Sequence, residues 1–133
     1  MKYPTTKSKN PVTILRTVAK AILEEPKRYY QEDYLIAKDS YPEWRSKRRF
    51  PSCGTIACVA GWTCLVTKEK GLQPHHVHTI AQRLLRLTDN EAYVLFGGEA
   101  LWNSPHSVGT KAYAKAGIAH IRRFVKEKWG KEL

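Results

Sequence analysis

Three cysteines and three histidines in the middle of the chain are the residues best suited to chemistry. They are Cys53, Cys58, Cys64, His75, His76 and His78. Thiolates and imidazoles bind zinc, but Cys-x4-Cys-x5-Cys lacks the closely paired ligands of zinc fingers and ribbons. A metal site would therefore have to combine Cys53 and Cys58 with one or two histidines, such as His75 and His78. Buried cysteines that act as small apolar side chains are the simpler interpretation.

Cys53 is the best candidate for a reactive group. A thiol at the start of a helix has its pKa lowered by the helix dipole, and a nearby histidine could serve as its base. However, no carboxylate flanks the three histidines to orient one of them, and the chain has no glycine-rich phosphate loop. We therefore expect no catalytic residue and no cofactor. A small Cys/His-dependent enzyme or metal-site protein is the alternative.

A second group of functional candidates lies in a basic segment between two aromatic residues. Trp44, Arg45, Lys47, Arg48 and Arg49 are followed by Phe50. Arginine grips phosphate groups through two parallel hydrogen bonds, and aromatic rings stack on bases, so this composition suits nucleic acid. The alternative is a solvated loop that its two aromatic side chains anchor to the core.

Four further cations recur at helical spacing near the C-terminal end. Lys111, Lys115, Arg122 and Lys126 are separated by four, seven and four residues, which predicts one stripe along a helix. Unpaired cations in such a stripe repel one another, and a polyanion would relieve that repulsion. The alternative is an ordinary solvated helix face.

The net charge of the chain is +11, and it is unevenly distributed. Residues 1–50 and 101–133 carry +6 and +5, whereas residues 51–100 are neutral. Basic surfaces attract polyanions and bind phosphate backbones in a salt-dependent manner. We therefore expect a non-enzymatic binding protein for nucleic acid or a nucleoprotein, encoded by a mobile element. An inhibitor or adaptor that binds an acidic protein surface is the alternative.

The elements that position these residues are predicted to be helical. The uncharged run Cys53–Val66 predicts a central helix at about 53–66 that is buried on all faces. Its small residues Ala57, Gly61 and Cys64 share one strip, which would let a neighbouring helix approach closely. Apolar spacing predicts further helices over 11–25, from Pro74, and over 108–128, and an aromatic helical piece at 29–38.

One more helix is predicted from its start signal. Thr88-Asp89-Asn90-Glu91 has the pattern of a capping box, and Gly97-Gly98 would end that helix. Residues 39–52 are predicted to be a loop. The fold class is therefore all-α: a compact single-domain bundle of about five helices at 11–133, preceded by a flexible basic arm at 1–10.

Two segments together resemble a known group of proteins. Cys53-Gly54-Thr55-x-x-Cys58-x-Ala60-Gly61-Trp62 is followed by Ala81-x-x-Leu84-Leu85-x-Leu87-Thr88-x-x-Glu91-Ala92-x-x-Leu95-Phe96. This combination is similar to small bacterial and phage proteins without an assigned activity. Here Arg86 stands where that group tends to have glycine. The resemblance implies a helical domain and brings no catalytic residues.

Composition also suggests a cellular location. The longest uncharged apolar run is shorter than the roughly 20 residues of a membrane span, and no signal peptide is recognisable at the N-terminus. An odd number of cysteines fits poorly with a disulfide framework. We therefore expect a cytoplasmic protein with no membrane partner.

Overall fold

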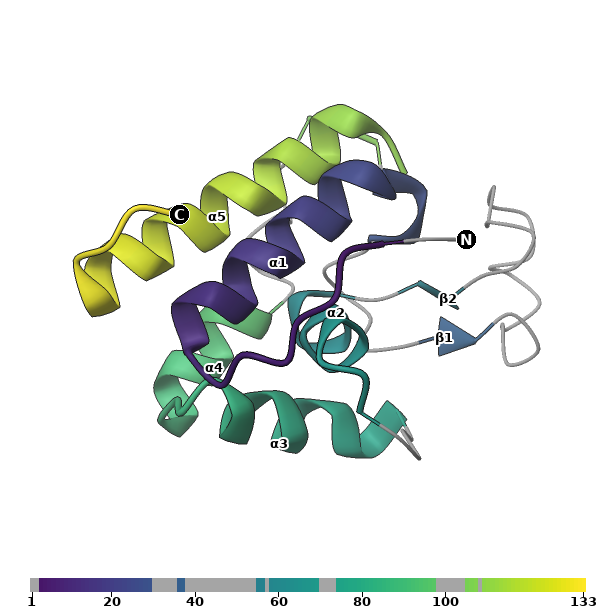
Figure 1. Cartoon of the computed structure of the whole chain (residues 1–133). Helices are drawn as coiled ribbons and strands as arrows, with labels where there is room; N and C mark the ends of the chain where they lie inside the picture. The colour runs from purple at the N-terminus through teal and green to yellow at the C-terminus, as the bar shows by residue number, and fades with distance from the viewer. Residues whose placement is uncertain are drawn as a thin grey trace.

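The computed structural model describes residues 3–29, 36–37, 55–56, 58–69, 74–97, 105–107 and 109–133. In this part of the chain the fold is all-α, and five helices share one apolar core (Figure 1). The helices are α1 (Pro11–Glu24), α2 (Val59–Val66), α3 (Pro74–Leu84), α4 (Asp89–Phe96) and α5 (Lys111–Trp129), and the 3-10 turn η1 (Pro26–Arg28) follows α1. None of these helices is long and apolar enough to cross a membrane.

α2 is the central helix of the bundle. It packs between α1 and α3 and also contacts α4. Its residues are buried except for Leu65, and the Thr63 hydroxyl donates to the Val59 carbonyl oxygen within the same helix. The uncharged sequence fits this position because no charged group has to be removed from water. The prediction of a buried central helix is confirmed.

The start of the central helix was predicted too early. α2 begins at Val59, with Cys58 as its N-cap, and not near residue 53. Thr55 and Ile56 instead form the short strand β2 (Thr55–Ile56), which pairs antiparallel with β1 (Ile36–Ala37). Thr55 and Ile56 are both β-branched, and such residues favour extended backbone. Ala57, which the predicted small-residue strip includes, lies outside the described residues.

The predicted aromatic helix at 29–38 is also not a continuous helix. The α-helix does not continue past Pro26, where the 3-10 turn η1 begins. Further along the chain, Ile36–Ala37 is a strand. Tyr29 follows η1 and is fully buried, with its ring 5.4 Å from that of Tyr113 on α5. Tyr29 is thus a buried side chain that follows a turn. The spacing of aromatic residues alone does not distinguish this arrangement from a helix.

α1 and α5 lie side by side and run in opposite directions (Figure 1). α1 starts as predicted, because the Asn10 side chain accepts hydrogen bonds from the backbone amides of Val12 and Thr13. α5 starts three residues later than predicted, after Thr110 as its N-cap, and ends at Gly130 in the left-handed region. These two helices form one outer layer of the molecule.

The turn between α3 and α4 is closed by two local motifs. The backbone amides of Arg86 and Leu87 donate to the carbonyl oxygens of Arg83 and Gln82, which is the hydrogen-bond pattern of a Schellman motif. Thr88 and Glu91 then form the predicted capping box, at 2.8 Å and 3.2 Å. Arg86 has φ 54°, the left-handed conformation that glycine adopts most easily.

Residues at the N-terminal end lie against α2. The Thr6 amide donates to the Val66 carbonyl oxygen at 2.8 Å, and the Tyr3 ring packs edge-on against Trp62 at 5.1 Å. The sequence predicts a flexible arm here, whereas Tyr3 and Thr6 are both in contact with the central helix.

Candidate anion-binding surface

The described cysteines are packing residues. Cys58 and Cys64 are fully buried and are not part of a disulfide, and the Cys64 Sγ lies 3.8 Å from the carbonyl oxygen of Val77. Burial raises the pKa of Cys58 to about 11 and that of Cys64 to about 12, so both thiols stay protonated at neutral pH. The described residues include no group of three His, Cys, Asp or Glu side chains placed to hold a metal ion.

Several residues of the predicted metal and nucleic-acid sites cannot be located. Cys53 and the segment with Trp44, Arg45, Lys47, Arg48 and Arg49 lie outside the described residues. His75 and His76 are on α3, but their side chains are not described. His78 packs edge-on against the Phe96 ring at 5.4 Å. Of the predicted metal ligands, Cys58 and His78 are the two whose side chains the structure describes, and the rest of that site lies outside the described residues.

All four cations predicted on the last helix are on α5, and all are exposed. They are Lys111, Lys115, Arg122 and Lys126. With a rise of about 1.5 Å per residue, this stripe is about 22 Å long. Lys126 forms an ion pair with Glu132 at 2.6 Å, which raises the pKa of Lys126 and lowers that of Glu132. Both side chains of that pair are largely exposed, so it contributes little to stability.

Arg122 of the cationic stripe lies on the side of α5 that faces α1. The opposite edge of α5 is covered by α4, where the His120 ring nitrogen Nε2 lies 3.0 Å from the Val94 carbonyl oxygen. Burial lowers the pKa of His120, so this ring is neutral at pH 7. His120 is therefore part of the contact between α4 and α5, and it adds no charge to the cationic stripe.

A second row of cations lies on α1, opposite this stripe. Arg16 and Lys20 are both exposed and one helical turn apart. Their side chains and that of Arg122 line a groove of about 470 Å³ between the two helices. This row of cations was not predicted from the sequence. Its signal was the four-residue spacing of two cations beside the apolar face of the first helix.

The groove combines a cationic rim with an apolar floor. Ala19, Leu23, Ile118 and Leu133 supply the apolar part, and Thr13 and Thr17 supply hydroxyl groups. Arg16 Nη2 donates to the Glu132 carbonyl oxygen at 2.7 Å, which places its guanidinium at the end of the groove. No carboxylate side chain is among the described residues that line this groove.

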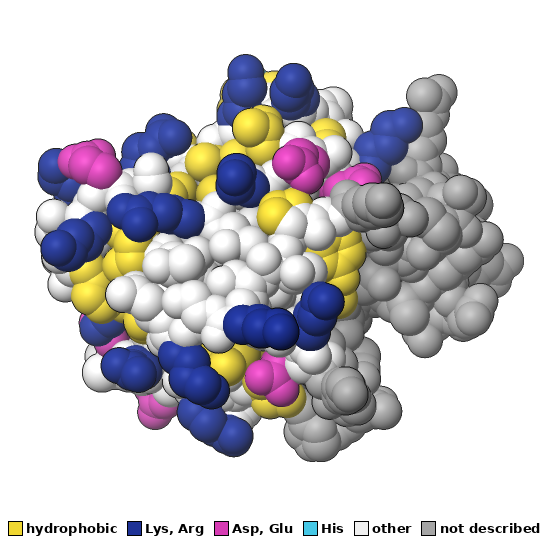
Figure 2. Space-filling view, viewed as in Figure 1, with side chains coloured by type: hydrophobic (Ala, Val, Ile, Leu, Met, Phe, Trp, Pro, Cys, Tyr) yellow, Lys and Arg dark blue, Asp and Glu magenta, His cyan; other side chains and the backbone are white. Residues whose placement is uncertain are grey.

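The charge pattern is visible on the face of the molecule that carries α1. Figure 2 shows Lys and Arg side chains spread over α1 and α5 and again near the C-terminal end of α3, with fewer acidic side chains between them. A few acidic side chains are also visible on this face. The structure thus brings Arg122 of the α5 stripe together with Arg16 and Lys20 at the groove. We call the four cations of the α5 stripe and these two residues of α1 the α1/α5 cationic surface.

In comparisons with protein-family models, with curated proteins and with solved structures, the chain matched none.

Proposed function

We propose that this protein is a non-enzymatic binding protein that engages nucleic acid through the α1/α5 cationic surface. The observation that carries the proposal is the groove itself. Two helices contribute cations to its rim, and no described lining residue has a carboxylate side chain. Arg16, Lys20 and Arg122 are thus held near one another by the packing of α1 on α5.

Electrostatics explains why such a surface favours a polyanion. Like charges on neighbouring helix turns destabilise a helix by a few tenths of a kcal/mol per pair at low ionic strength. A phosphate backbone relieves that repulsion and releases its own condensed counterions into solution. Binding of this kind reads charge and not base sequence. We therefore expect an affinity for nucleic acid that depends strongly on salt and weakly on sequence.

A second candidate partner is an acidic protein segment. The apolar floor of the groove favours it, because Leu23 is 39% exposed and lines the groove together with Ile118. An amphipathic helix with an acidic face would cover these apolar side chains and pair with the rim. Such a partner would make the protein an inhibitor or adaptor.

A cytoplasmic location and a mobile-element origin are part of the proposal. Nucleic acid and thiols in their reduced form are both found in the cytoplasm. The resemblance to small phage proteins supports the origin in a mobile element.

Fluorescence anisotropy tests the proposed function directly. Labelled single-stranded DNA and RNA are titrated with the protein over a range of salt concentrations, and Lys115→Gln/Arg122→Gln is compared with the natural sequence. We expect log affinity to fall linearly with log salt, with a shallower slope for the double variant by about 0.7 for each lost phosphate contact. Absence of binding at low salt would overturn nucleic acid as the ligand. Capture of an acidic protein after nuclease treatment, lost in the same double variant, would then support the second candidate.

A further inference from the structure

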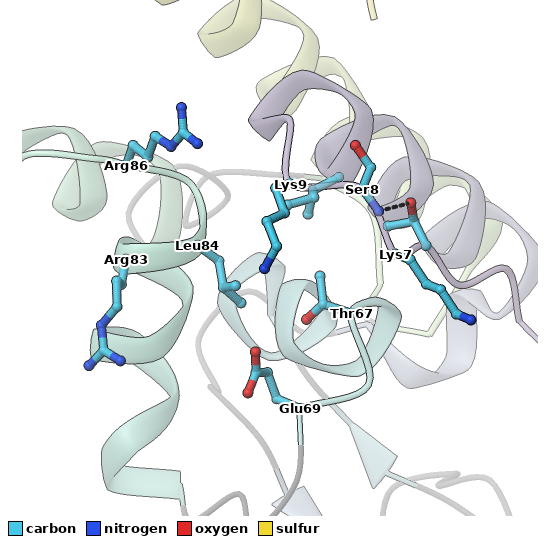
Figure 3. A pocket seen from close by; sticks show the side chains of 10 residues that line it. Lys7, Ser8, Lys9, Thr67, Glu69, Arg83, Leu84 and Arg86 are labelled. Atoms are coloured by element: carbon cyan, nitrogen blue, oxygen red, sulfur yellow. Dashed lines mark hydrogen bonds between the residues drawn. The ribbon is translucent and has the colours of Figure 1, made fainter.

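A second cationic hollow lies on the other side of α1. It has a volume of about 260 Å³ and is bordered by the segment before α1, the end of α2 and the end of α3. Lys7, Lys9, Arg83 and Arg86 line it, with Glu69 as its one acidic lining residue among those described. Figure 3 shows the Lys9 side chain directed into the hollow, with Thr67 and Glu69 across from it. Figure 3 also shows the Lys7 and Arg83 side chains directed away from the centre, so Lys9 is the cation aimed into a hollow whose lining has four cations and one described carboxylate.

The backbone at Arg86 gives this hollow a second distinguishing feature. Arg86 has φ 54° at the left-handed position of the Schellman motif that ends α3. A long side chain is strained there, whereas glycine is not. Lys68, at the end of α2 beside the hollow, also has a positive φ of 59°. Two strained positions next to one hollow thus both hold cations, and strained backbone is common at binding sites.

The hollow and the groove are separated only by the first turns of α1. Ile14 lines the hollow, and its neighbour Thr13 lines the groove. An α-helix with its side chains is about 10 to 12 Å wide. Lys9, which lines the hollow, lies just before Asn10 and the start of α1. One extended ligand can therefore reach both by crossing the N-terminal end of α1.

We propose that the hollow is a second phosphate-binding site for the same nucleic acid strand, which passes from the groove over the start of α1 to Lys9, Arg83 and Arg86. This inference rests on the proposed function. It adds a path for the strand across the start of α1 and predicts that binding depends on the length of the ligand. A short oligonucleotide fills the groove alone, and a longer one occupies both sites.

The test compares two lengths of single-stranded DNA by anisotropy, about 4 and about 16 nucleotides, which bracket common site sizes. The variant is Arg83→Gln/Arg86→Gln, and the control is Lys27→Gln/Arg123→Gln, which removes the same charge from exposed positions outside both sites. We expect the first variant to reduce the salt slope by about 1.4 with the long strand only, because two phosphate contacts are lost. The control should lower the slope by less than half of that with either length.

Three different results would count against the second site, the crossing path or the proposed function. Equal slopes for the variant and the control with the long strand would overturn the second site. Equal loss with both lengths would show an independent site and overturn the crossing path. If the natural sequence binds neither length, the proposed function itself fails. The melting temperature of the variant, measured in parallel, separates lost contacts from lost folding.

Discussion

Gly117 on α5 lies directly against the phenol ring of Tyr29, which reaches it from beyond η1. A Cβ atom at position 117 would overlap the ring atoms of this tyrosine. The ring is fully buried and packs on Tyr113, so it has little room to move aside. The absence of a side chain at Gly117 is therefore what lets Tyr29 enter the core beside the cationic helix.

Gly117→Ala should lower the free energy of unfolding. Overpacking of this kind costs about 1–3 kcal/mol, which exceeds the gain of up to about 1 kcal/mol that alanine brings to a helix. Urea denaturation measures the difference. In a Tyr29→Ala background the clash is gone, so the same change should be neutral or stabilising. A Gly117→Ala protein as stable as the natural sequence would show that Tyr29 is not fixed against α5.

The capping box at the start of α4 should contribute measurably to stability. Thr88→Ala removes the acceptor for the Glu91 amide and should cost about 1 kcal/mol, whereas Thr88→Ser keeps an equivalent oxygen. Thermal unfolding of the two variants side by side measures this difference. Equal melting temperatures would mean that water replaces the cap at no cost.

The ion pair between Glu91 and Lys128 should make stability depend on pH. The two side chains meet at 2.6 Å, and the hydrogen bond from Lys128 lowers the pKa of Glu91 below its usual value of 4.5. Because the folded-state pKa is lowered, this stabilisation is present above pH 4.5 and is lost as the pH falls through the lowered value. Melting curves of the natural sequence and of Glu91→Gln should therefore converge in acid. Parallel curves across this range would contradict the pairing.

Arg86 offers a test of backbone strain that is independent of binding. Its positive φ is compatible with glycine and poorly tolerated by a β-branched residue. Arg86→Gly should be about as stable as the natural sequence or more stable, and Arg86→Val should be less stable by about 1–2 kcal/mol. The reverse order in chemical denaturation would show that the turn does not adopt this conformation.

Much of the fold could be predicted from the sequence, because local signals agreed with packing. Asn10-Pro11 and Thr88-x-x-Glu91 start helices where their capping chemistry requires, and the uncharged run marks the central helix. Its start could not be predicted, because Cys53 to Cys58 is as apolar as the helix and only strand pairing with Ile36–Ala37 distinguishes the two. The α5 stripe followed from spacing. The position of Arg16 and Lys20 beside this stripe could not be predicted from spacing. It depends on the packing of α1 against α5, which are far apart in the sequence.

The matched pair Arg122 and Arg123 tests the central claim most directly. Both are exposed neighbours on α5 that point about 100° apart, and only Arg122 lines the groove. The measurement is the salt dependence of single-stranded DNA binding for Arg122→Gln and Arg123→Gln, which have the same net charge. If the groove binds the phosphate backbone, Arg122→Gln should lower the log–log slope by about 0.7 and Arg123→Gln should change it far less. Identical slopes for the two variants would contradict the account, because binding would then depend on total charge and not on the α1/α5 cationic surface.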